Sequence, residues 1–125
     1  HVWRPTIPIN IHYKQNNYGY LALVDSGADG CIFHGSIGDS LGILVDEGKK
    51  TSLSGVTKGG GVVYYHNVIL EVGGWKFKSY VGFSYDLRFS LGLLGQRGFF
   101  EFFSIVFDFK KKIADLRPKY VKLVA

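Results

Sequence analysis

Short apolar runs, many of them alternating with polar residues, recur along the chain and are separated by Gly, Asn and Asp. A period of two is typical of strands that bury one face of a sheet. Turns are expected at residues 15–19 and at Gly73-Gly74, where the composition favours tight reversals. The predicted strands span residues 7–13, 20–24, 50–53, 62–65, 68–72, 75–83, 91–95, 104–109 and 112–116.

Two segments favour short helices. Ser36 is suited to cap a helical turn that Gly42 would end, and residues 98–103 could form one or two further turns. A mostly β chain with one or two short helices predicts a closed, barrel-like sheet.

The composition fits one packed domain. Of the 125 residues, 46% are hydrophobic, including 10 Phe, 8 Tyr and 2 Trp, and only 20% are charged. We therefore expect residues 1–125 to form a single domain. The surplus of apolar residues would suit either a dimer interface or a small aromatic-rich core. The chain contains no Met, so we expect it to be processed or cut from a longer protein.

Cysteine content, hydropathy and charge narrow the possible partners. Cys31 is the only cysteine, so we predict a buried thiol, and the sequence favours no particular compartment. No apolar run approaches the ~18 residues of a membrane span. The net charge is +5, with three cations at Lys110-Lys111-Lys112 between two apolar runs. We interpret these lysines as a solvated hairpin turn rather than as a patch for nucleic acid.

The candidate chemistry lies in the segment Leu21-Ala22-Leu23-Val24-Asp25-Ser26-Gly27-Ala28-Asp29. An acidic residue at the end of a buried strand is costly unless it has partners or a function. Ser26 can hydrogen-bond the carboxylate or the loop, and Gly27 allows a tight turn. The alternative is a structural Asx-turn, which Asp-Ser-Gly also favours.

This segment resembles the catalytic loop of aspartic proteases, and Ala28 points to their retroviral-type branch, the retropepsins. Two further features match the order of parts in that family. A Gly-rich hairpin over residues 50–65 stands where retropepsins carry the flap, and Leu93-Leu94-Gly95 matches a late apolar-apolar-Gly triplet. The tail from Phe103 to Asp108 is more similar to cellular, especially prokaryotic, members than to viral ones.

The resemblance implies an aspartic endopeptidase that needs no cofactor or metal. Such an enzyme uses two carboxylates, and no other Asp here is followed by Ser/Thr-Gly. The second carboxylate would therefore come from the Asp25 of another copy in a symmetric homodimer, acting on a polypeptide substrate. The implied catalytic residues are Asp25, Ser26 and Gly27, and the implied substrate-binding residues are Ala28, Asp29, Gly55, Val56, Thr57, Lys58, Gly59 and Gly60.

The chain departs from the viral pattern after the late glycine. Viral members place there an Arg that pairs with the acid four residues after the catalytic Asp, whereas this chain has Gln96 followed by Arg97. The ion pair of Asp29 and its grip on the substrate backbone are therefore not assured. Ile32, Val56, Phe83 and Leu93 could line apolar subsites or belong to the core.

Other functions stay open at this point. The same fold could serve as a non-cleaving dimerisation or peptide-binding module. A basic β-barrel could bind nucleic acid through the three lysines and exposed Tyr residues. The histidines at positions 12, 34 and 66 show no metal-ligand spacing.

Overall fold

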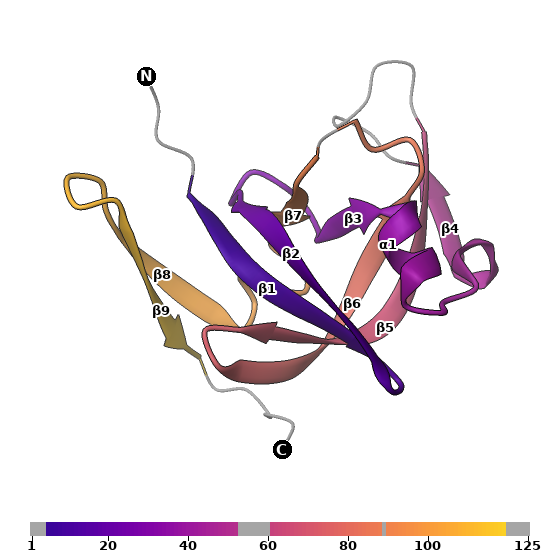
Figure 1. The fold of residues 1–125 in the computed structure, drawn as a ribbon. Coiled ribbons are helices and arrows are strands. Elements are labelled where there is room, and N and C mark those ends of the chain that lie inside the picture. Colours follow the sequence, from indigo (N-terminus) through magenta and orange to yellow (C-terminus); the bar gives the residue numbers. More distant parts are fainter. Residues whose placement is uncertain (1–4, 53–60, 89, 120–125) are drawn as a thin grey trace.

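A six-stranded β-barrel forms the body of the molecule (Figure 1). The computed structural model describes residues 5–52, 61–88 and 90–119. Neighbouring strands follow the order β1-β2-β7-β3-β6-β5, and β5 pairs back onto β1, which closes the barrel. β4 extends the sheet beyond β5. The predicted mostly β, barrel-like fold is confirmed.

The strands agree with the alternating pattern in position and differ mainly at their ends. They are β1 (Thr6–Tyr13), β2 (Asn16–Val24), β3 (Ile32–His34), β4 (Lys49–Ser52), β5 (Val62–Val72), β6 (Trp75–Ser84), β7 (Gly92–Leu94), β8 (Phe103–Asp108) and β9 (Ile113–Pro118). The first turn occupies only Lys14 and Gln15, because Tyr13 already pairs with Asn16. The strand predicted to start at residue 20 therefore begins earlier, at Asn16.

The hairpin of β5 and β6 is longer than the sequence suggested. The polar pair His66-Asn67 predicted a break between two strands, but β5 runs through it. Pairing with β6 is continuous from Tyr64↔Phe83 to Val72↔Trp75. Gly73 and Gly74 close this hairpin with φ of 56° and 85°, a left-handed conformation that glycine adopts without strain.

One short α-helix, α1 (Gly35–Ser40), and a 3-10 helix, η1 (Val45–Glu47), follow β3. The prediction of Ser36 as the cap was wrong: His34 is the N-cap, and its side chain accepts a hydrogen bond from the Ser36 N–H. Gly42, with φ of 81°, follows the last turn as expected. Neither helix of the described residues is long and apolar enough to cross a membrane.

The predicted helix at residues 98–103 is replaced by hydrogen-bonded turns. Gly98 has φ of 96°, which is incompatible with a right-handed helix. The turn is stabilised by bonds that span five residues, from the Phe100 N–H to the Gly95 carbonyl and from the Glu101 N–H to the Gln96 carbonyl. It nevertheless buries Phe99 and Phe103 completely.

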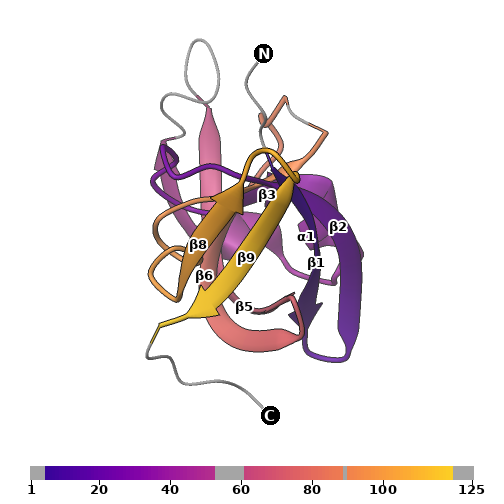
Figure 2. The same cartoon turned by 90° about the vertical axis from the view of Figure 1, so that its left-hand side faces the viewer.

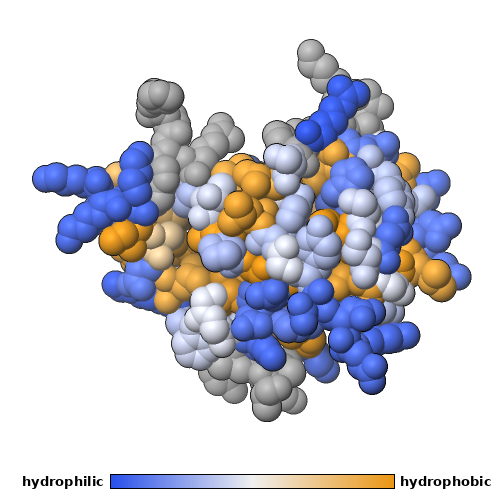
Figure 3. Space-filling view, viewed as in Figure 1, coloured by the Kyte–Doolittle hydropathy of each residue, from blue (hydrophilic) through white to orange (hydrophobic). Residues whose placement is uncertain are grey.

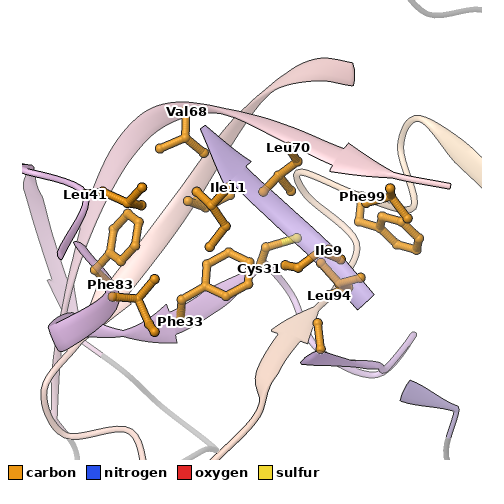
Figure 4. Close-up of a cluster of buried hydrophobic side chains, with 14 of the residues drawn as sticks. Ile9, Ile11, Cys31, Phe33, Leu41, Val68, Leu70, Phe83, Leu94 and Phe99 are labelled. Carbon is orange, nitrogen blue, oxygen red and sulfur yellow. The ribbon is translucent and has the colours of Figure 1, made fainter. Parts of the chain in front are cut away.

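Aliphatic and aromatic side chains from all six strands of the barrel fill its interior and form the core (Figure 4). Cys31 lies among them, and burial raises the pKa of its thiol to about 12. Phe83 is also fully buried, while Ile32 and Leu93 are nearly so. These three residues therefore belong to the interior and do not line an open subsite.

The last hairpin, β8 and β9, lies across one side of the barrel as a separate two-stranded sheet (Figure 2). Its inner face packs on the core through Phe103, Ile105 and Leu116. The tip from residue 109 to 112 is exposed and carries the three lysines. The predicted exposed hairpin turn is confirmed, while the expectation that it does not bind nucleic acid stays a prediction.

Candidate active site

Asp25 stands directly at the end of β2, where three strands come together. β7 lies between β2 and β3, parallel to β2 and antiparallel to β3. The Asp25 N–H donates to the Leu94 carbonyl, with N and O 3.0 Å apart, so the β2–β7 ladder extends to Asp25 itself. The sheet therefore fixes the backbone that carries this carboxylate.

A tight turn then orients the Asp25 side chain. The Gly27 N–H donates to Asp25 Oδ1 over 2.9 Å, and the Ala28 N–H donates to the Asp25 carbonyl over 3.1 Å. Asp25 is half-buried, whereas Ser26 and Gly27 are exposed. The first bond is an Asx-type contact, and it holds a carboxylate in reach of solvent.

The segment after β7 supports the other side of this loop. The Gln96 N–H donates to the Ala28 carbonyl and the Arg97 N–H to the Asp29 carbonyl, both over 2.9 Å. A Cβ on Gly95 would lie 2.4 Å from the Gly30 carbonyl oxygen. The late triplet Leu93-Leu94-Gly95 thus lies against the Asp25 loop, and this close approach requires glycine at position 95.

Gln96 contributes a side-chain contact that the sequence did not reveal. Its Nε2 donates to the Ser26 carbonyl oxygen over 2.7 Å. From the sequence, Gln96 was only a departure from the viral pattern. The structure makes it a positioning residue for the turn, since it fixes the peptide between Ser26 and Gly27. Its place next to Gly95 was the one signal that could have suggested this role.

Asp29 is exposed and forms no ion pair within the described part of the chain. Arg97 meets Asp29 through the backbone only. Both charges act on the half-buried phenol of Tyr65. Desolvation is the largest influence and raises the Tyr65 pKa, Arg97 lowers it and Asp29 raises it. Among the described residues, no cation forms an ion pair with the Asp29 carboxylate beside the loop.

The expected flap residues Gly55, Val56, Thr57, Lys58, Gly59 and Gly60 lie outside the described residues. The arms of their hairpin are β4 and β5, which pair from Lys49↔Tyr65 to Ser52↔Val62. At the base of the hairpin, the Val62 N–H donates to Asp86 Oδ2 over 2.9 Å, and Ser84 Oγ donates to the Val62 carbonyl over 2.6 Å. Figure 1 shows this end of β4 and β5 on the same upper side as the end of β2.

Chemically, the described part of the site offers a positioned carboxylate at Asp25 and an exposed second carboxylate at Asp29. No group of metal-ligating side chains occurs among the described residues. A carboxylate held by hydrogen bonds at a strand end can act as a general acid or base.

No family model and no curated protein matches the chain in sequence. Solved structures with the same arrangement include the EIAV protease complexed with the inhibitor HBY-793. It matches with a TM-score of 0.54 and 21% identity, over 75% of this chain and 83% of that chain. The chain has a retropepsin-like fold.

Within the retropepsin-like fold, β8 is the segment whose sequence resembles that of cellular members. That closer resemblance stays a prediction, because the likeness to a retroviral protease concerns the fold alone.

Proposed function

We propose that the chain is an aspartic endopeptidase whose active unit is a homodimer. The observation that carries this proposal is the Asp25 loop at the junction of β2, β7 and β3. There a half-buried carboxylate is oriented by the Gly27 N–H and supported by Gln96 and Gly95. The retropepsin-like fold supports the same function.

In the proposed reaction, two Asp25 carboxylates meet on the two-fold axis and share one proton. The ionised carboxylate takes a proton from a water molecule as the water attacks the peptide carbonyl carbon. The protonated carboxylate donates to the carbonyl oxygen, which becomes the hydroxyl of a tetrahedral intermediate. Ser26 and Gly27 keep the two carboxylates in place.

The need for a second copy follows from the count of candidate carboxylates. Asp25 is the only Asp in the sequence followed by Ser/Thr-Gly. Apolar surface next to this loop also favours association. Leu21 is 49% exposed and pairs across the sheet with the exposed Pro8. Figure 3 shows apolar residues on the face over β1 and β2.

The proposed substrate is an extended polypeptide. Ala28 and Asp29 would meet its backbone on one side, because they follow the Asp25 turn directly. The hairpin carried by β4 and β5 would cover the other side. Its proposed binding residues are Gly55, Val56, Thr57, Lys58, Gly59 and Gly60.

The test is cleavage of an unstructured polypeptide by the wild-type chain and by Asp25→Asn. Asp46→Asn is the matched control, because Asp46 is an exposed carboxylate on η1. We expect Asp25→Asn to lose cleavage by about a thousandfold or more, and Asp46→Asn to keep it. Wild-type activity per chain should fall on dilution as the dimer dissociates.

Two outcomes would refute the proposal. One is comparable cleavage by Asp25→Asn, and the other is a fully active monomer in a sedimentation experiment at the assay concentration. Absence of cleavage by a well-folded dimer at every pH would favour the non-cleaving peptide-binding module.

A further inference from the structure

A cleft opens where β1 and β5 separate, at the end of the barrel away from Asp25. The two strands pair only from Ile9↔Val72 to His12↔Ile69. Beyond that pair, β1 continues into its hairpin turn while β5 continues in its pairing with β6, and a cleft of about 540 Å³ lies between β1 and β5. In Figure 1 the β1–β2 turn lies at the lower end of the barrel, and β2 ends at the upper side. The cleft is lined by His12, Tyr13, Lys14, Asn67, Val68, Ile69 and Lys78.

The lining combines cations with apolar surface. His12, Ile69 and Lys78 form one row across β1, β5 and β6, because Ile69 pairs with both of the others. Side chains that pair directly across a sheet point to the same face. Lys14, in the hairpin turn after β1, also lines the cleft and adds a second ammonium group. The cleft therefore presents two lysines together with the outward-facing side chain of Ile69, whereas Val68 is buried in the core.

The carboxylate beside this cleft is already paired. Glu71 Oε1 lies 2.7 Å from His12 Nε2, and Glu71 itself does not line the cleft. Because His12 is hydrogen-bonded to Glu71, the two lysine ammonium groups supply the positive charge that faces the cleft.

Lys14 occupies an unusual backbone conformation for its residue type. Its φ of 53° lies in the left-handed region, where the first residue of a two-residue hairpin loop favours Gly, Asn or Asp. Its ammonium group lies 5.4 Å from the centre of the Tyr13 ring, which limits where the charge can go. A strained residue with a positioned charge is a feature found at ligand sites.

We propose that this cleft binds a small anionic ligand, with its carboxylate or phosphate group between Lys14 and Lys78 and its apolar part against Ile69. The Asn67 amide is a further donor at the rim. The volume suits a ligand larger than a bare ion. This site is separate from the proposed protease site and does not depend on it.

The test is an NMR titration of the ¹⁵N-labelled full chain with inorganic phosphate and, separately, with succinate. Sodium chloride keeps the ionic strength constant. Saturable shifts at the amides of Lys14, Asn67 and Lys78 are expected with at least one of the two anions. Saturation by phosphate alone identifies a phosphate ligand, and saturation by succinate alone identifies a carboxylate ligand.

Three variants separate this site from general charge effects. Lys14→Gly removes one cation at a position that accepts glycine, and Lys78→Gln removes the other. Each should weaken binding about fivefold or more, while Lys110→Gln at the exposed hairpin tip should leave it unchanged. Asp25→Asn should also bind normally. Shifts that stay linear with both anions, or an affinity equal to that of the wild type in Lys14→Gly and Lys78→Gln, would overturn the proposal.

Discussion

Replacing Gly95 with Ala is a sharp test of how the Asp25 loop is held. The added Cβ would lie 2.4 Å from the Gly30 carbonyl oxygen and 2.6 Å from the Ala28 carbonyl oxygen. Both distances are shorter than any normal carbon–oxygen contact. The opposing atoms are backbone, so no rotamer change can relieve the clash, and the loop or β7 must move.

The cost follows from the packing and hydrogen bonds at this point. Overpacking in a well-filled interior costs about 1–3 kcal/mol. Movement of the loop also weakens the bond between the Gln96 N–H and the Ala28 carbonyl, worth about 1 kcal/mol. We expect Gly95→Ala to lower the free energy of unfolding by about 3 kcal/mol, and the melting temperature by about 10 °C.

Urea unfolding and calorimetry measure this loss, with Gly19→Ala as the matched control. Gly19 is an exposed β2 residue, and a Cβ there would meet only Asn10 Oδ1 at 3.4 Å. The control should stay within about 0.5 kcal/mol of wild type. If Gly95→Ala is as stable as Gly19→Ala, the described contact between the late triplet and the Asp25 loop is wrong.

Three further changes test separate parts of the account. Gln96→Ala removes the 2.7 Å bond to the Ser26 carbonyl. It should lower kcat several-fold while costing only about 1 kcal/mol in urea unfolding, and an unchanged kcat would remove Gln96 from the positioning residues. Asp25→Asn should keep the fold, since an amide oxygen can still accept from the Gly27 N–H; a shift in melting temperature beyond a few degrees would contradict this. The folded pKa of Cys31 is raised from 9.0 to about 12, so an unfolded chain loses this proton first as the pH rises. Stability should therefore fall between pH 9.0 and about 12, by at most about 1.4 kcal/mol per pH unit. In urea unfolding at several pH values, the free energy of unfolding of Cys31→Ala should therefore fall less steeply with pH than that of the wild type. The same pH dependence in both proteins would show that the thiol is not buried as described.

Much of the fold could be predicted because alternation and glycine turns act locally. The hairpin at Gly73-Gly74 is an example, since both residues need a left-handed backbone. The polar pair His66-Asn67 wrongly suggested a break between two strands, because continuous pairing with β6 keeps β5 a single strand. The prediction of a helix at residues 98–103 was wrong because Gly98 adopts a positive φ, which the pattern of side chains does not reveal.

The candidate site was predictable to the extent that its chemistry is local. Asp25, Ser26 and Gly27 form one local turn, which the short motif predicted; their catalytic role stays a prediction. The support from Gln96 joins positions that are 70 residues apart in the sequence, and only the β2–β7–β3 arrangement brings them together. The sequence left Phe83 open between a subsite wall and the core, and its complete burial decides for the core.

The most direct test of the central claim is the distance between the two Asp25 carboxylates in a crystal structure of the associated protein. The account predicts a symmetric dimer with the two carboxylates within hydrogen-bonding distance, about 3 Å, across the two-fold axis. A monomer, or a dimer that keeps the two Asp25 side chains apart, would contradict it.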